Sequence, residues 1–281
     1  MLNGLMTTPN TWLITGASSG LGLALTERAL SAGHRVVATT RQGALPVQHP
    51  LLTVVHLDPA DRQQCRRIVE EAQKVAGSLD VVVNNAGYGL VGAVEEISEE
   101  EARAIVDVDL FGPLWLTQAA LPLMRSQGCG HIVQISSTGG VGAMPMLGLY
   151  NAAKWGLEGF TEALASEVQP MGIRVTLVEI GAMDTQWATS GMQFSAPDAA
   201  YDELREKLFG TPTVPWPSDP GATGGGTSPE YIADGILAHI AAEDGPLRLV
   251  LGDGAADQIR MVLDRRQQDY ATQPGFQSSA G

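Results

Sequence analysis

Cysteines, basic residues and long apolar runs are scarce in this sequence, and each shortage excludes a class of protein. The two cysteines, Cys65 and Cys129, lack metal-ligand spacing and give no disulfide framework, so no metal site is predicted. Only 17 residues are Lys or Arg against 31 Asp or Glu, and the net charge of −14 opposes nucleic acid binding. No uninterrupted apolar run reaches the ~18 residues of a membrane span, so none is predicted.

The length and the hydrophobic content of the chain suit a soluble protein with a substantial core. The 281 residues fit one large α/β domain or two small ones, and 44% of them are hydrophobic. Residues 1–10 hold no basic residue and no apolar core, which predicts a short disordered lead and not a secretory signal. The polar stretch 273–281 predicts a disordered tail. We therefore expect one domain over 11–272 in a cytoplasmic protein.

Short apolar runs alternate with helical patterns along the chain, and there are no internal repeats. The runs predict seven strands, at residues 12–15, 35–40, 52–56, 80–83, 131–135, 173–179 and 247–251. The helical patterns lie at 23–33, 61–76, 98 onward, 150–168, 228–243 and 255–270. Ser98 and Glu101 form a capping box, and Pro113 should bend or break the helix that they open. This alternation predicts a doubly wound parallel sheet with helices on both faces.

Residues 181–227 lose this pattern, and we call this stretch the lid. It holds several prolines, three consecutive glycines and only one short helical pattern, at about 201–208. A stretch this long without regular structure is usually a functional cover over a site or is disordered. The sequence therefore predicts a substrate lid here.

A glycine-rich turn joins the first strand to the first helix. It consists of Gly16, Ala17, Ser18, Ser19, Gly20, Leu21 and Gly22. Glycines let the backbone approach a pyrophosphate, and the helix N-terminus directs N–H groups and a positive dipole end toward it. Outside this context the spacing would indicate only a tight turn, but between a strand and a helix it favours a dinucleotide site.

The end of the second strand indicates which dinucleotide is bound. An acid there would bond the ribose 2′-hydroxyl and repel a 2′-phosphate, but this chain has Thr40 followed by Arg41. A guanidinium matches a phosphate well, which favours NADP(H) over NAD(H). The alternative is that Arg41 is an ordinary loop charge. The fourth strand ends in Asn84–Gly87, at the sheet edge where such folds bind ligands.

Tyr150 and Lys154 lie four residues apart on one predicted helix, so their side chains share a face. A nearby ammonium favours the phenolate and lowers the pKa of a tyrosine, which suits it to proton transfer. Ser137, at the end of the fifth strand, could hold a substrate oxygen beside the phenol. Taken alone, the pair could also be a solvated helix face.

Together these motifs resemble the short-chain dehydrogenase/reductase family, over roughly residues 11–255. Four motifs match in order and spacing: Thr15-Gly16-x-x-x-Gly20-x-Gly22, Asn84-Asn85-Ala86-Gly87, Ser137 and Tyr150-x-x-x-Lys154. The resemblance implies a single-domain, Rossmann-type fold that binds NADP(H). It also implies a homodimer or homotetramer formed through the helices around Ala104 and Phe160.

The resemblance also implies roles for individual residues. Tyr150 would be the general acid/base, Lys154 would bond the nicotinamide ribose and lower the tyrosine pKa, and Ser137 would orient the carbonyl. The resemblance also implies that the glycine turn, Arg41, Tyr150 and Lys154 contact the cofactor. The further implied cofactor contacts are Asp58, Asn85, Ala86, Gly87, Gly181 and Thr185.

Two positions depart from the family pattern. Asp109 stands where the family has an asparagine that holds a water linking the catalytic lysine to solvent. Its carboxylate should favour a protonated Lys154 and disfavour the phenolate of Tyr150, so we count it among the catalytic candidates. Ile180 replaces the usual proline before Gly181, and its backbone can still serve the cofactor.

The leading hypothesis is an NADP(H)-dependent carbonyl reductase or alcohol dehydrogenase. Its substrate would be a hydrophobic ketone or secondary alcohol, because the candidate pocket residues are bulky and mostly apolar. These are Tyr88, Met144, Met146, Trp187, Met192 and Phe194. Each of them could instead be ordinary core or lid packing. The alternatives are redox-neutral chemistry that uses Asp109, such as cyclisation, dehydration or isomerisation, and a nucleotide-binding sensor.

Overall fold

A computed structural model describes residues 10–189, 191–216, 222–242, 244–273 and 275–276. The predictions of disorder for residues 1–9 and 277–281 lie outside this described part.

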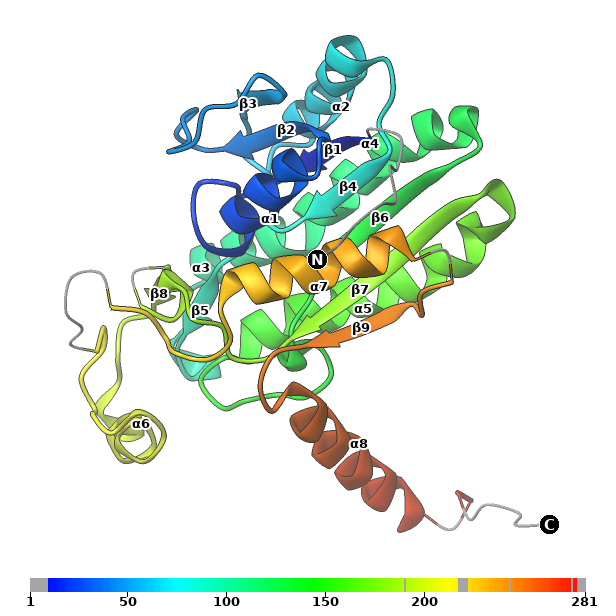
Figure 1. Ribbon diagram of the computed structural model, residues 1–281. Coiled ribbons are helices and arrows are strands. Elements are labelled where there is room, and N and C mark those ends of the chain that lie inside the picture. Colours follow the sequence, from blue (N-terminus) through cyan, green and yellow to red (C-terminus); the bar gives the residue numbers. More distant parts are fainter. Residues whose placement is uncertain (1–9, 190, 217–221, 243, 274, 277–281) are drawn as a thin grey trace.

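Seven parallel strands form the central sheet (Figure 1), in the order β3-β2-β1-β4-β6-β7-β9. They are β1 Thr11–Ile14, β2 Arg35–Thr40, β3 Leu52–His56, β4 Val81–Asn84, β6 Gly130–Ile135, β7 Ile173–Ile180 and β9 Arg248–Leu251. The predicted seven-stranded parallel sheet is thus confirmed. The strand order reverses between β1 and β4, which opens a crevice at the carboxyl ends of these strands, where open α/β sheets bind ligands.

Helices cover both faces of the sheet, because successive strand residues point to opposite sides. The long helices are α1 Gly20–Ser31, α2 Arg62–Ala76, α4 Gly112–Gln127, α5 Gly148–Val168, α7 Pro229–Ala241 and α8 Ala255–Ala271. On one face Trp12 and Ile14 join a core that includes residues of α1 and α7. On the other face Leu13 joins a core that includes residues of α2, α4 and α5. Figure 1 shows α8 extending away from the body of the fold.

The expected break at Pro113 does not occur. The chain is helical over Glu99–Gln127, through α3 Glu99–Val106, a π-helical turn Asp107–Phe111 and α4. In that turn the N–H of Gly112 donates to Asp107 O, five residues back. Pro113 then occupies the start of α4, where a missing N–H costs little. Such π turns are rare and often accompany functional sites, and this one carries Asp109.

By length and mean hydropathy, the helical stretch Glu99–Gln127 is also apolar enough to cross a membrane. Polar residues interrupt this stretch, so it contains no uninterrupted apolar run of that length. In the structure Leu116, Ala120 and Met124 are buried against strand residues of the sheet. This is the packing of a core helix in a globular domain.

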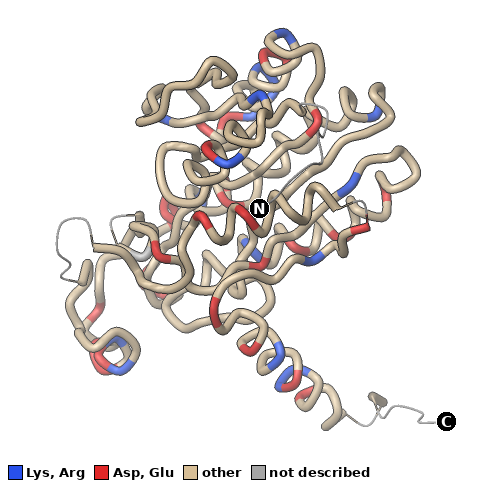
Figure 2. The backbone as a smooth tube through the Cα atoms, in the orientation of Figure 1, with Lys and Arg blue, Asp and Glu red and all other residues tan. Residues whose placement is uncertain are grey.

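The lid has more regular structure than the sequence predicts. Its short strand β8 Met192–Phe194 pairs in parallel with β5 Gly89–Val91. Its helix α6 Asp202–Phe209 agrees with the predicted helix at 201–208. Figure 2 shows acidic residues spread along the whole chain, with Lys and Arg interspersed on α2, α6 and α8.

Candidate functional site

The glycine turn after β1 has the backbone shape that a phosphate cradle needs. Gly16 and Gly20 adopt φ values of +66° and +52°, which L side chains rarely adopt. A Cβ on Gly22 would lie 2.3 Å from Gly16 O, so no side chain fits there. Ser19 precedes α1 without a side-chain cap, and the first turn of α1 has no acid. The helix N–H groups there suit an anion, so these residues fit a dinucleotide pyrophosphate.

Hydrogen bonds that involve Asn85 and Thr15 hold the glycine turn in place. The Asn85 side-chain amide donates to Thr15 O at 2.8 Å and to Gly16 O at 3.2 Å. The Thr15 hydroxyl accepts from the N–H groups of Asn85 and Ala86, each at 3.0 Å. The Asn85 side chain and the N–H groups of Asn85 and Ala86 thus bind protein, which leaves the carbonyls of these two residues and Gly87 for the expected cofactor contact. Thr15 belongs to the recognised motif, but sequence reasoning gave it no role.

The predicted adenosine side of the site lies at the carboxyl ends of β2 and β3. Thr40 is buried, and its hydroxyl accepts from Gln42 N at 3.1 Å. Arg41 follows it on the surface and forms no ion pair with any residue that the structure describes. Asp58 is half-buried, and its carboxylate accepts from Ala60 N at 3.0 Å. No acid occupies the end of β2, so Arg41 remains available to a phosphate.

Thr185 and Gly181 connect the glycine turn to the start of the lid. A Cβ placed on Gly20 would lie 3.3 Å from Thr185 Cγ2, so these two residues are neighbours. The Thr185 hydroxyl accepts from Trp187 N at 3.3 Å. Gly181 N donates to Leu251 O at 3.0 Å, which commits that N–H to the sheet. Thr185 therefore lies beside the glycine turn, and its cofactor contact stays a prediction, whereas the N–H of Gly181 is committed to Leu251 O.

Tyr150, Ser137 and Lys154 meet as predicted. The Ser137 and Tyr150 side chains are neighbours, because Ser137 Oγ and Tyr150 Cε1 both lie within 3.4 Å of a Cβ placed on Gly139. Lys154 Nζ lies 5.7 Å from the centre of the tyrosine ring. Tyr150 and Lys154 are both buried, which excludes a solvated helix face. Burial raises the pKa of Tyr150, while Lys154 and the nearby Ser137 hydroxyl act to lower it. The expected net lowering is thus not reached in this structure, because desolvation outweighs the ammonium.

Asp109 is brought into the same group by the π turn. Its Oδ2 lies 3.3 Å from Lys154 Nζ, and its Oδ1 accepts from Tyr88 N at 3.1 Å. Burial raises the pKa of Asp109 despite the opposing charge of Lys154. Burial also acts to lower the pKa of Lys154, but the charge of Asp109 acts against it and the net shift is upward. Lys154 additionally donates to Ile135 O at 3.2 Å, so the ammonium is held at both sides.

Of the six candidate substrate residues, two pack directly around Tyr150. The Trp187 ring centre lies 5.3 Å from that of Tyr150, and Tyr88 belongs to the same apolar cluster. Burial raises the pKa of Tyr88 to about 12. Met192 lies beside Trp187, because both approach the position of a Cβ on Gly89.

The other three candidates lie farther from the phenol. Met146 and Phe194 pack in a separate apolar cluster with residues of α6, and Met192 belongs to this cluster as well. Met144 is 56% exposed, and its carbonyl accepts from the Asn151 side chain at 3.1 Å. A wall formed by Tyr88, Trp187 and Met192 is therefore the part of the predicted pocket beside Tyr150.

Comparison with known proteins agrees with this arrangement. Residues 10–194 match the family model of the short chain dehydrogenases. Oxidoreductase BOA17 of Botryotinia fuckeliana is 36% identical over 262 residues, which cover 88% of this chain and 90% of the relative. A 3-ketodihydrosphingosine reductase of Bacteroides thetaiotaomicron is 40% identical over 177 residues, 63% of this chain and 65% of the relative. A crystal structure of a short-chain dehydrogenase from Streptomyces avermitilis is 35% identical, with a TM-score of 0.81 and coverage of 94% and 96%.

The fold and the site define a dinucleotide-dependent α/β oxidoreductase, and the chain belongs to the short-chain dehydrogenase/reductase family. It is an NAD(P)-dependent enzyme of that family. Solved structures with this fold include complexes with NADP and with NAD. The choice between these two cofactors therefore depends on the residues of this chain.

Proposed function

We propose that this enzyme transfers hydride between NADP(H) and a hydrophobic ketone or secondary alcohol, with Tyr150 as general acid/base. The observation that carries the proposal is the buried Tyr150 phenol, which has the Ser137 side chain as a neighbour and the Lys154 ammonium 5.7 Å from the centre of its ring. A phenol held next to a second hydroxyl can donate its proton to a carbonyl oxygen that both groups contact.

Each side chain has a distinct part in this mechanism. In the reducing direction Tyr150 gives its proton to the carbonyl oxygen, which Ser137 holds and orients. Lys154 stabilises the phenolate that remains, and Asp109 and Ile135 O hold the ammonium in place. In the oxidising direction the phenolate takes the alcohol proton back. When bound, the nicotinamide supplies or accepts the hydride.

NADP(H) is the preferred cofactor in this proposal because of Arg41. It is an exposed guanidinium directly after β2, at a position where no carboxylate repels a 2′-phosphate. The apolar wall of Tyr88, Trp187 and Met192 supports a hydrophobic substrate, and the Bacteroides relative is named as the reductase of a keto compound.

Redox-neutral chemistry through Asp109 has weaker support. The Asp109 side chain is 0% exposed and is already engaged by Lys154 and by Tyr88 N. A carboxylate enclosed in this way has no surface to offer to a substrate, so it serves the lysine.

Replacing Tyr150 with Phe tests the proposal. Turnover of an apolar ketone with NADPH should fall by about 10² to 10⁴, because the proton donor is lost, whereas NADPH binding should stay unchanged. Tyr231, which is 64% exposed on α7, provides the control variant Tyr231→Phe. Unchanged turnover in Tyr150→Phe would refute the role of Tyr150. Retained NADPH binding with no ketone turnover in the unaltered protein would favour the sensor alternative.

A homodimer or homotetramer is also part of the proposal. Phe111 is 36% exposed next to α4, and Trp155 is 44% exposed on α5. Exposed aromatic residues on neighbouring helices are common in protein interfaces. Light scattering at micromolar concentration should therefore give a mass of at least two chains, and a monomer would contradict this expectation.

A further inference from the structure

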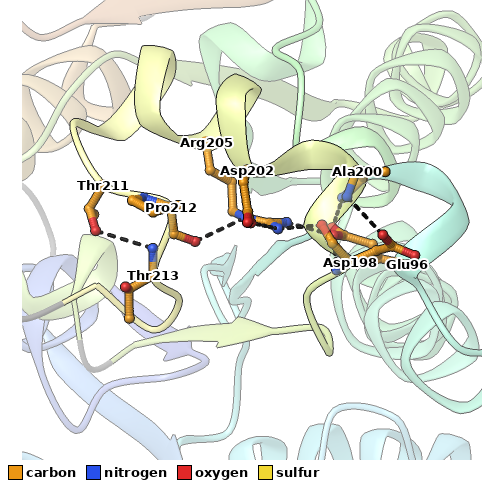
Figure 3. A network of polar contacts seen from close by, with 9 residues as sticks. Glu96, Asp198, Ala200, Asp202, Arg205, Thr211, Pro212 and Thr213 are labelled. Atoms are coloured by element: carbon orange, nitrogen blue, oxygen red, sulfur yellow. Dashed lines mark hydrogen bonds and ion pairs between the residues drawn. The ribbon is translucent and has the colours of Figure 1, made fainter.

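Arg205 is a charged side chain on α6 of the lid that is only 1% exposed. Its guanidinium Nη1 lies 2.5 Å from Glu96 Oε1. The other nitrogens donate within the lid, Nε to Pro212 O at 3.0 Å and Nη2 to Asp198 O at 2.5 Å and Asp202 Oδ1 at 2.7 Å (Figure 3). One planar group thus joins three parts of the lid to one carboxylate outside it.

Glu96 is the partner on the body of the fold, in the 3₁₀ turn Val94–Glu96 after β5, and it is 2% exposed. Its Oε1 also accepts from Asp198 N at 2.7 Å, and its Oε2 accepts from Ala93 N at 2.6 Å. The carboxylate is therefore anchored on its own segment and binds the lid twice. Hydrogen bonds to the charged form act to lower the pKa of Glu96 against the opposing effect of burial, and the net shift is downward.

An apolar cluster lies beneath this charged contact and joins the same two segments. Its members come from β5 and the residues after it, from the loop before α5, and from the lid: Val91, Ala93, Met146, Leu147, Met192, Phe194, Tyr201, Leu204, Phe209 and Trp216. The Phe194 and Trp216 rings meet edge to face, with centres 4.8 Å apart. The lid is therefore docked on β5 by the strand pairing of β8, by apolar packing and by the buried Arg205–Glu96 ion pair.

The docked position of the lid matters for the pocket because the same strands carry its wall. β8 pairs with β5, and Met192 and Trp187 both contact Gly89 on β5. Trp187 in turn lies against Tyr150. Loss of the attachment at Glu96 would leave β8 held by its pairing with β5 and by the apolar cluster alone, and so would loosen the wall beside Tyr150.

We propose that Arg205 is a positioning residue for substrate binding, which holds the lid on Glu96 so that Trp187 and Met192 stay beside Tyr150. This inference rests on the proposed function. Removal of Arg205 leaves the Glu96 carboxylate buried without its counter-charge, which strongly favours separation of the lid from the body. Lysine cannot replace Arg205. Its single ammonium cannot contact Glu96, Pro212 O and Asp198 O at once, whereas the three nitrogens of the planar guanidinium do.

Three variants test the proposal: Arg205→Met, Arg205→Lys and the control Arg260→Met. Arg260 forms an exposed ion pair with Asp257 on α8, so its loss changes charge without touching the lid. If the docked lid falls to about a tenth of the molecules, the apparent KM for an apolar ketone rises about tenfold. The kcat should change much less, because bound substrate holds the lid in place, and NADPH affinity should stay constant.

A second readout does not depend on catalysis. Lys207 follows Arg205 on α6 and is exposed, and it remains a trypsin site in both Arg205 variants. Cleavage after Lys207 should become at least about tenfold faster in Arg205→Met, because protease attack follows the population of the open form. Arg205→Lys should behave like Arg205→Met in KM, although it keeps the charge.

Wild-type KM together with wild-type cleavage in Arg205→Met would overturn the proposal. An equal loss of NADPH affinity in Arg205→Met and Arg205→Lys would also overturn it, because the effect would then not be confined to the lid. If Arg205→Met does not fold, Arg205→Lys decides the matter by the same two readouts. If the unaltered enzyme turns over no ketone, the proposed function fails, whereas the cleavage rates still decide whether Arg205 holds the lid.

Discussion

Asp109 Oδ2 lies 3.3 Å from Lys154 Nζ, and both side chains are buried. The pair lies next to Tyr150, whose pKa Lys154 acts to lower and Asp109 acts to raise. The carboxylate thus cancels part of the effect that a lone lysine would have on the phenol. The π turn Asp107–Phe111 places Asp109 at this point, so the local helix geometry determines which charge lies beside Tyr150.

Asp109→Asn should move the pH dependence of alcohol oxidation to lower pH. Oxidation needs the phenolate, and removal of the negative charge of Asp109 lowers the pKa of Tyr150. We expect the midpoint of the alkaline-rising limb to move to lower pH, because one of the charges that raise the pKa of Tyr150 is removed. The measurement is kcat/KM for a secondary alcohol between about pH 6 and 10.

Asp107→Asn is the control for this experiment, because Asp107 lies in the same π turn but is exposed. Its pH profile should match that of the unaltered enzyme. A midpoint that stays in place or rises in Asp109→Asn would contradict the electrostatic role assigned to Asp109.

Arg41→Ala should reduce the preference for NADPH. Loss of one charge-assisted contact to the 2′-phosphate should weaken NADPH binding by about tenfold or more, while NADH, which lacks that phosphate, should bind as before. Fluorescence titration with each reduced cofactor gives both dissociation constants.

Arg66→Ala makes the same change in net charge at an exposed position on α2 and should leave both constants unchanged. Equal binding of NADPH and NADH by the unaltered protein would show that Arg41 gives no preference.

The sheet could be predicted from sequence because its strands are apolar runs with turn or helix patterns between them. Val81, Val82 and Val83 are fully or almost fully buried, so their pattern is continuous and easy to recognise. β5 and β8 have only three residues each and show no measurable period. Their pairing depends on where the lid docks, so local sequence could not reveal it.

In the candidate site, too, some contacts follow from local sequence and others exist only in the folded chain. Tyr150 and Lys154 share a helix face, so their proximity follows from spacing alone. Arg205 and Glu96 are 109 residues apart, and their contact exists only in the folded chain. The inward direction of the Asn85 amide likewise depends on the glycine turn that lies above it.

Arg248, at the start of β9, contacts three carboxylates, of which two are buried. It lies 2.8 Å from Glu179, 3.2 Å from Glu158 and 2.8 Å from Glu162. Glu179 is 1% exposed, and burial, followed by the charge of Glu158, raises its pKa. Burial also raises the pKa of Glu158. Two buried carboxyl groups therefore compete for one partly exposed guanidinium.

The sign of the resulting pH dependence follows from linkage. A carboxyl whose pKa is higher in the folded state than in the unfolded chain binds more protons when folded, so stability falls as pH rises above the unfolded pKa, about 4.3 for Glu. Glu179→Gln removes this loss. At pH 7.5 its melting temperature should exceed that of the unaltered protein by roughly 2–4 °C, equivalent to about 1 kcal/mol for a domain of this size. At pH 4.5 the difference should shrink, because this pH is close to the unfolded pKa of about 4.3, above which the loss of stability begins.

Glu162→Gln is the matched control, because Glu162 contacts the same guanidinium but is 55% exposed. Exposed ion pairs contribute little to stability, so its melting temperature should stay close to that of the unaltered protein at both pH values. Scanning calorimetry at pH 4.5 and 7.5 compares all three proteins. A Glu179→Gln protein that melts lower at pH 7.5 would mean that the Arg248–Glu179 attraction exceeds the cost of burying the carboxylate, and that this cluster stabilises the fold at neutral pH.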